Sequence, residues 1–231
     1  MTLNKEIGLD GTFIFEDSQK GWKISRFIPN CRNMDPANRD EVAHVMNMGR
    51  KLHEAPVKLD RYFDFYDESQ RYKSLLLEKG PIDIPGFKEM SDKFDQLARY
   101  MRADNAPVCL CHNDFFSLNV LIDEQDTYYL IDWEYAGMGD YANDFGTFCV
   151  CCQLLEDGVS YALEAYFERE PTEAEARHNL GMVAMAGWCW YLWSLLKEAE
   201  GDYVGEWLYI YFNYAQKYID RSLESYEPAG E

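Results

Sequence analysis

The sequence predicts an α+β protein in which helices dominate and strands are confined to two short regions. β-Prone residues run through 12–15 and 22–27, around the turn-like segment EDSQKG. Short apolar runs recur at 108–111, 120–123 and 128–132. Apolar residues at helical spacing fill most of the remaining chain. These three observations favour a small strand content beside a large helical part.

Each element follows from local residue patterns, beginning with a hairpin over 12–27 that ends before Pro29, which lacks a backbone donor. Residues 39–53 have helical periodicity with Asn38 as a candidate N-cap, and 60–77 and 87–102 also predict helices. The three later apolar runs predict brief strands at one small sheet edge. Beyond them, helices are expected near 141–155, 160–169, 173–198 and 203–218.

Composition limits the possible partners. The 231 residues include 41 acidic and 22 basic side chains, a net charge of -19 that repels nucleic acid and anionic membranes and suits cationic small molecules. The beginning of the chain, MTLNKEIGLDGTF, has no apolar core of a signal peptide, and no run is long enough for a membrane span. A cytoplasmic protein without membrane insertion is therefore expected.

The seven cysteines predict reduced thiols rather than a disulfide framework. Five of them, namely Cys109, Cys111, Cys149, Cys151 and Cys152, gather around the central stretch, which raises the question of a metal site. None forms a CxxC pair, and the alternation of Cys109 and Cys111 is typical of one face of a buried strand. Buried, inert thiols are therefore expected in preference to a zinc site.

A polar cluster between the apolar runs carries the candidate chemistry. In HNDFFSLN, a carboxylate at Asp114 precedes an amide at Asn119 by five positions, as in kinase catalytic loops, where the Asp accepts the hydroxyl proton and the Asn holds Mg²⁺. Asp132 ends the next apolar run, and Glu134 follows on the same strand-like face. His112 is expected to brace the loop. Any one of these residues alone is more often a turn or cap former, but their ordered combination is rare by chance.

The strings HNDFFSLNVL and IDWEYAGMGDYANDFG closely resemble the LicA-type choline kinases, within the choline and ethanolamine kinase family. The resemblance implies a protein-kinase-like (aminoglycoside phosphotransferase-like) fold, with 1–30 as a reduced N-lobe hairpin and hinge and 31–231 as the helical C-lobe. By this likeness the backbone of Arg26, Phe27 and Ile28 meets the adenine of ATP. Asp114 is then the base, and Asn119, Asp132 and Glu134 hold or support Mg²⁺.

Aromatic residues downstream predict a cation pocket. Trp190 and Trp193 share one helical face, as do Tyr211 and Tyr214. Aromatics at this spacing are usually core, but choline has no hydrogen to donate and needs ring faces and carboxylates. In the choline kinases the corresponding positions line the choline site, which implies substrate binding here. Asp144 either adds negative charge to this pocket or caps its helix.

The resemblance also implies an N-terminally truncated form. Full-length relatives begin with strands that supply a phosphate-covering loop and a lysine, whereas Lys5, the only lysine before the hairpin, lies in no such strand. The expected activity is phosphorylation of choline to phosphocholine by Mg·ATP. Two alternatives stay open: a kinase of ethanolamine, an aminoglycoside or another amino alcohol, and a catalytically impaired choline-binding protein.

Overall fold

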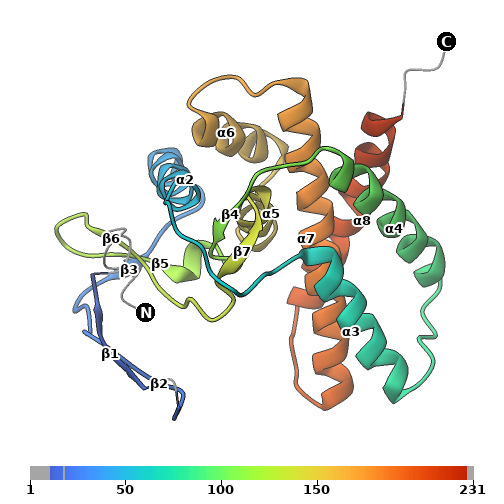
Figure 1. The fold of residues 1–231 in the computed structure, drawn as a ribbon, viewed down its shortest axis with the longest axis horizontal. Helices are drawn as coiled ribbons and strands as arrows, with labels where there is room; N and C mark the ends of the chain where they lie inside the picture. The colour runs from blue at the N-terminus through green and yellow to red at the C-terminus, as the bar shows by residue number, and fades with distance from the viewer. Residues whose placement is uncertain (1–10, 18, 228–231) are drawn as a thin grey trace.

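The computed structural model describes residues 11–17 and 19–227 of the chain (Figure 1). Strands lie in the N-terminal half and in the middle of this part, and helices form most of the rest. The expected α+β class with a mostly helical C-terminal part is therefore confirmed. Lys5 falls outside the described residues.

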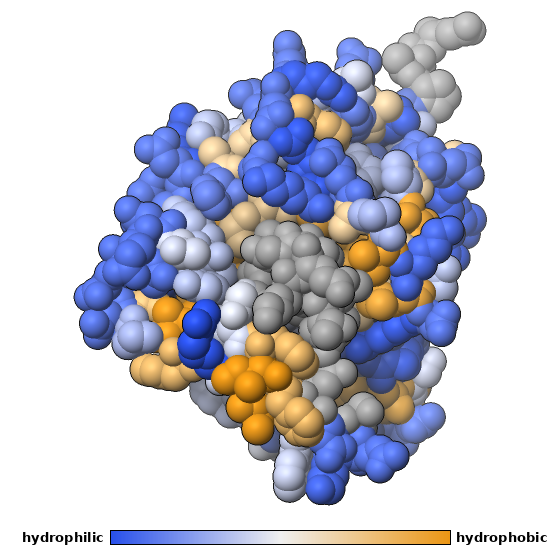
Figure 2. Space-filling model, turned by 60° about the vertical axis from the view of Figure 1, so that its left-hand side comes forward, coloured by the Kyte–Doolittle hydropathy of each residue, from blue (hydrophilic) through white to orange (hydrophobic). Residues whose placement is uncertain are grey.

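The predicted hairpin is present as β1 (Phe13–Asp17) and β2 (Trp22–Ser25), paired antiparallel. It extends to one side of the helical part in Figure 1. Most of its large apolar side chains are exposed, with Ile14 at 61% and Trp22 at 60%. Figure 2 turns this side forward and shows hydrophobic residues at the surface between hydrophilic ones. The hairpin thus contributes little to the core.

The remaining strands form two small sheets. The first contains β3 (Arg32–Asn33), β5 (Val120–Ile122) and β6 (Tyr128–Leu130) in the order β3-β5-β6, and the second pairs β4 (Val108–Cys111) with β7 (Gly137–Asp140). The prediction of one shared sheet edge was therefore wrong, because β4 has a different partner. That partner, GMGD, has no apolar run to reveal it.

Glycine is required in β7 by close packing. A Cβ atom at Gly139 would lie 2.5 Å from Asn143 Nδ2 and 2.7 Å from the carbonyl oxygen of Phe63. Both neighbours belong to the framework behind the central loop, so a larger residue would displace them. The absence of a side chain here explains why a strand occurs without the usual β-prone residues.

The helices predicted at 39–53, 87–102 and 173–198 lie within two residues of their predicted bounds. The helices predicted at 60–77, 141–155, 160–169 and 203–218 are displaced by several residues at one or both ends. The first helix occupies the predicted residues, and Asn38 caps it by accepting hydrogen bonds from the backbone N–H groups of Asp40 and Glu41. None of the described helices combines the length and apolar character needed to cross a bilayer. The helices are α2 (Arg39–His53), α3 (Phe65–Lys79), α4 (Phe87–Ala103), α5 (Ala142–Cys151), α6 (Glu156–Phe167), α7 (Glu173–Glu200) and α8 (Trp207–Tyr226).

Helix α7 is the centre of the helical part and packs against α3, α5 and α8 (Figure 1). Its 28 residues begin at a capping box, in which Thr172 and Glu175 each bind the other's backbone N–H. At Gly187 an added Cβ would lie 2.8 Å from the backbone nitrogen of Ala215, so α7 and α8 approach closely there. This contact holds the tryptophans of α7 beside the aromatic start of α8.

His178 connects three elements near the start of α7. Its Nδ1 lies 2.8 Å from Asp104 Oδ2 after α4, and its Nε2 lies 2.9 Å from Asp140 Oδ2 in β7. Burial alone would lower the pKa of His178, but hydrogen bonds and charge attraction to the two carboxylates outweigh it and raise the pKa. The protonated ring therefore stabilises the fold.

This histidine predicts a pH-dependent contribution to stability. Because the folded-state pKa is raised, the contribution is full below the ordinary histidine pKa of about 6.5 and is lost as the pH rises through the folded-state value. We expect His178→Gln to lower the free energy of unfolding by more at about pH 6 than at about pH 9. Urea unfolding followed by tryptophan fluorescence measures the free energy of unfolding at both pH values. His44→Gln is the control, since the pKa of His44 is lowered, and equal losses for His178→Gln at both pH values would contradict the assignment.

Candidate active site

One buried carboxylate holds the loop between β4 and β5 in place. Asp144, at the start of α5, accepts hydrogen bonds from the backbone N–H groups of His112 at 2.9 Å and Asn113 at 2.6 Å. Asn113 has a φ of 65°, a left-handed conformation that asparagine tolerates better than most residues. Both N–H groups are buried and would otherwise lack partners, so Asp144 fixes the direction in which the loop leaves β4.

The ring of His112 is buried and makes two hydrogen bonds. Its Nε2 donates to the carbonyl of Ile131 at 2.8 Å, and its Nδ1 accepts from the backbone N–H of Asp114 at 3.3 Å. The indole of Trp133 packs edge-on at 4.7 Å between ring centroids. Burial lowers the pKa of His112, so the neutral ring is favoured. The ring thus ties the loop to the segment after β6 and offers no free nitrogen at the surface.

The side chains of Asp114 and Asn119 lie next to each other in the loop. The Nδ2 of Asn119 donates to Asp114 Oδ2 and to the Asp114 carbonyl, both at 2.8 Å. Burial raises the pKa of Asp114 to about 6, the Asn119 hydrogen bond opposes this rise, and the charges of Asp132, Glu134 and Asp144 add to it. The carboxylate is therefore ionised at neutral pH and basic enough to accept a proton.

Asp132 and Glu134 lie beyond β6 rather than on a strand. Strand β6 ends at Leu130, Asp132 adopts a φ of 61°, and Glu134 lies in a turn. The expectation that Asp132 ends a strand and that Glu134 shares its strand-like face was therefore wrong. Both side chains are exposed, and their charges raise the pKa of Asp114. Both carboxylates thus lie close enough to the loop for their charges to act on Asp114.

A cavity of about 560 Å³ opens beside Asp114. Trp190, Trp193 and Tyr211, three of the four aromatic residues proposed from the sequence, line it. The rings of Trp190 and Trp193 meet edge to face at 6.1 Å between centroids. Sequence reasoning missed several further lining residues, although Tyr135 lies inside the string IDWEYAG and Trp207 in an aromatic run. Tyr135, Asp202, Tyr203 and Trp207 are among these further residues, and the cationic Lys197 also lines the cavity.

Two residues proposed for substrate binding lie elsewhere. The hydroxyl of Tyr214 donates to the carbonyl of Leu154 at 2.7 Å, and its ring stacks on Tyr218 at 6.0 Å. Asp144 is 1% exposed, and its carboxylate is engaged by the loop backbone and by His53. Neither side chain lines the 560 Å³ cavity. The structure thus places both residues outside this cavity: Tyr214 packs against the core, and Asp144 anchors the loop.

The proposed hinge lies at the surface between the hairpin and β3. The backbone N–H of Arg26 donates to the Thr12 carbonyl at 2.7 Å, and Phe27 is 84% exposed. Ile28 is half-buried. The chain then enters β3, where Asn33 Nδ2 donates to the Leu118 carbonyl at 2.8 Å, inside the loop that bears Asn119. Strand β3, which follows the hinge segment, is thus connected to the loop.

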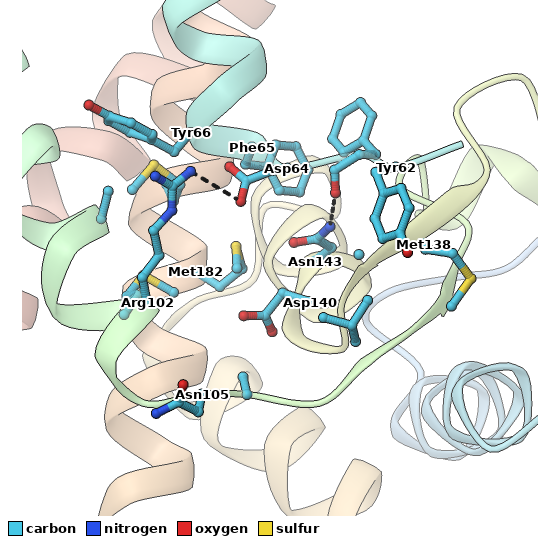
Figure 3. Close-up of a pocket in the computed structure, with 17 residues that line it drawn as sticks. Tyr62, Asp64, Phe65, Tyr66, Arg102, Asn105, Met138, Asp140, Asn143 and Met182 are labelled. Carbon is cyan, nitrogen blue, oxygen red and sulfur yellow. Dashed lines mark hydrogen bonds and ion pairs between the residues drawn. The ribbon is translucent and has the colours of Figure 1, made fainter. Parts of the chain in front are cut away.

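A second cavity, of about 340 Å³, lies behind the loop among α3, α4, β7, α5 and α7 (Figure 3). On one side, Asn143 donates to the Phe63 carbonyl at 3.2 Å and to Asn113 Oδ1 at 2.9 Å. On the other, Arg102 pairs with Asp64 at 3.6 Å. Asn143 therefore supports the loop through Asn113.

Comparison with known proteins places this geometry among phosphotransferases. Residues 19–178 match the model of the phosphotransferase enzyme family. Protein LicA of Haemophilus influenzae is 26% identical over 227 residues, and the match covers 91% of this chain and 79% of that protein. A second LicA protein of the same species is also 26% identical, and the match spans 62% of its length. An ethanolamine kinase of Drosophila melanogaster is 29% identical over 192 residues, covering 72% of this chain and 35% of that protein. The predicted resemblance to LicA-type proteins is confirmed.

Solved structures show the same architecture. Choline kinase LicA from Streptococcus pneumoniae superposes with a TM-score of 0.82 at 21% identity, covering 95% of this chain and 78% of that chain. A structure of LicA in complex with AMP superposes with a TM-score of 0.80 at 21% identity, and the match covers 97% of this chain and 76% of that chain. The predicted aminoglycoside phosphotransferase-like fold is thus confirmed.

Proposed function

Because the chain belongs to the phosphotransferase enzyme family, we propose that it transfers the γ-phosphoryl group of ATP to the hydroxyl of choline, forming phosphocholine. One observation carries this proposal: the carboxylate of Asp114 lines the same cavity as Trp190, Trp193 and Tyr211. A base therefore lies beside ring faces suited to a cation. An alcohol that carries a quaternary ammonium group satisfies both features at once.

The residues proposed as metal ligands fit Mg²⁺. Asn119 uses its amide nitrogen on Asp114, which leaves its amide oxygen for a cation. Asp132 and Glu134 offer exposed carboxylates that repel Asp114, and oxygen donors are the ligands Mg²⁺ prefers. When bound with ATP, Mg²⁺ would neutralise charge on the transferring phosphoryl group. The repulsion among these carboxylates favours binding of a divalent cation.

In the proposed reaction, Asp114 orients the choline hydroxyl and accepts its proton. The hydroxyl oxygen forms a bond to the γ-phosphorus as the bond from that phosphorus to the bridging oxygen of ADP breaks. Asn119 holds the Asp114 carboxylate in place through its hydrogen bond at 2.8 Å. We infer that residues 1–30 belong to the nucleotide side, with the backbone of Arg26, Phe27 and Ile28 beside adenine.

Ethanolamine is the second candidate acceptor. Its primary ammonium group has hydrogens to donate, and Glu134 and Asp202 also line the cavity. Asp202 already pairs with Lys197 at 3.4 Å. Aromatic rings outnumber these acceptors in the lining, which favours choline. The trimethylammonium group of choline gains cation–π attraction and apolar contact without needing hydrogen bonds.

Steady-state assays of ADP release with choline and with ethanolamine test the proposal. We expect kcat/KM for choline to exceed that for ethanolamine by at least about tenfold, which corresponds to roughly 1.4 kcal/mol of transition-state binding. Trp193→Ala should raise KM for choline because one ring face is lost. Tyr214→Phe is the matched control and should leave KM unchanged, since Tyr214 lies outside the cavity lining.

Two outcomes would contradict this function. Calorimetric binding of choline without any phosphocholine formation would favour a choline-binding protein. Faster turnover of ethanolamine or an aminoglycoside would keep the reaction class and replace the acceptor.

A further inference from the structure

Two cysteine thiols of β4 and one histidine ring lie close together outside the candidate active site. A ring nitrogen of His53, the Sγ of Cys109 and the Sγ of Cys111 all lie within 4.8 Å of one another. His53 is the last residue of α2, and the two cysteines alternate along β4, so their side chains share one face of that strand. The cluster lies outside the cavity lined by Asp114.

The distance between the two sulfur atoms suits a shared metal ion. Cys109 Sγ and Cys111 Sγ lie 3.8 Å apart. Two thiolates bound to one tetrahedral zinc ion at about 2.3 Å each lie about 3.8 Å apart, as the tetrahedral angle requires. The sulfurs already have this separation, so binding needs little movement of the strand.

Both ring nitrogens of His53 have hydrogen-bond partners, and only one of these partners is a neutral group that a metal ion could displace. Its Nε2 lies 3.0 Å from Asp144 Oδ2, and an ionised carboxylate only accepts, so Nε2 carries a hydrogen. Its Nδ1 lies 2.8 Å from the hydroxyl of Tyr166. A metal at Nδ1 would replace the hydroxyl contact and keep the carboxylate behind the ring. Zinc-bound histidines are commonly oriented by a carboxylate in this way.

From this geometry we propose that His53, Cys109 and Cys111 form a binding site for a soft divalent cation such as Zn²⁺. The two thiols lose their protons to solvent as two metal–sulfur bonds form, and a protonated His53 would also lose its Nδ1 proton. A water molecule or the Tyr166 hydroxyl completes four-coordination. Cys109 is half-buried rather than fully enclosed, which gives an ion a route from solvent.

This site would be linked to the catalytic loop through one carboxylate. Asp144 binds His53 on one side and the backbone N–H groups of His112 and Asn113 on the other. A metal at the cluster would therefore fix α2, β4 and the start of the loop relative to one another. The site does not depend on which acceptor the protein phosphorylates, because none of its residues lines that cavity.

Titration of the full, reduced, metal-free chain with Cd²⁺ and Zn²⁺ tests the proposal without using activity. We expect one Cd²⁺ per chain with a sulfur-to-cadmium charge-transfer band in the ultraviolet. We also expect Zn²⁺ to raise the unfolding temperature of the wild type. Cys109→Ser and Cys111→Ser should each weaken binding by at least about tenfold, which matches the lower range for perturbed metal sites. Cys31→Ser, which removes a half-buried thiol elsewhere, is the matched control and should bind as the wild type does.

Three results would overturn the proposal. The first is a wild type that shows no charge-transfer band at one equivalent of Cd²⁺. The second is an equal loss of binding in Cys31→Ser. The third is retention of full affinity by both Cys109→Ser and Cys111→Ser. The two serine variants keep the size of the side chain, and their circular dichroism spectra show whether they fold as the wild type does.

Discussion

Replacing Asp114 by asparagine is expected to lower kcat for choline phosphorylation by about 10²–10⁴-fold, the usual effect of removing a general base. The amide has nearly the shape of the carboxylate and can still accept the hydrogen bond from Asn119. It cannot accept the hydroxyl proton. We therefore expect KM for choline to change much less than kcat, because the aromatic lining remains.

Stability measurements distinguish lost chemistry from lost folding. Burial raises the pKa of Asp114 to about 6, so the ionised carboxylate is unfavourable in the folded protein above that pH. Asp114→Asn should therefore be more stable than the wild type at about pH 8, by about 1–3 kcal/mol, with the gain vanishing below about pH 4. Asp126→Asn, an exposed position in the β5–β6 turn, is the control and should retain full activity. Equal rates for Asp114→Asn and wild type would show that Asp114 is not the base.

Local patterns predicted the elements whose signals are contained in a few neighbouring residues. Helix α2 and its cap at Asn38 are encoded by helical periodicity and one side chain, and the structure has both. Strand β7 has no such signal, because Gly139 is required by the atoms of Asn143 and Phe63 that approach it. Contacts between residues far apart in sequence therefore determine that these residues form a strand.

The same distinction applies to the candidate site. The order of Asp114 and Asn119 along one loop was enough to predict that they lie together, and their side chains are 2.8 Å apart. Helical spacing placed Tyr211 and Tyr214 on one face, but only the packing of α8 decides which ring reaches the cavity. The partner of Cys109 and Cys111 in the proposed metal site is His53, on a helix more than fifty positions earlier. No local spacing could have indicated it.

Asp144 should be the most sensitive position for stability. Its carboxylate accepts hydrogen bonds from two buried backbone N–H groups and from His53. Burial alone would raise the pKa of Asp144, but these donors and the charge of His53 outweigh it and lower the pKa. The ionised carboxylate is thus the stabilising form, and its contribution is lost only as the pH falls through the lowered pKa.

We expect Asp144→Ala to lower the free energy of unfolding by about 3–5 kcal/mol at neutral pH, because it leaves buried donors and an imidazole without their partner. Urea unfolding followed by tryptophan fluorescence measures this loss. Asp157→Ala removes a carboxylate that is 75% exposed and pairs with Arg39 at 3.6 Å, so its effect should stay within about 0.5 kcal/mol. If Asp144→Ala were no more destabilising than Asp157→Ala, the loop would be held by other contacts. A large loss would instead show that one buried carboxylate couples folding of the core to the position of Asp114.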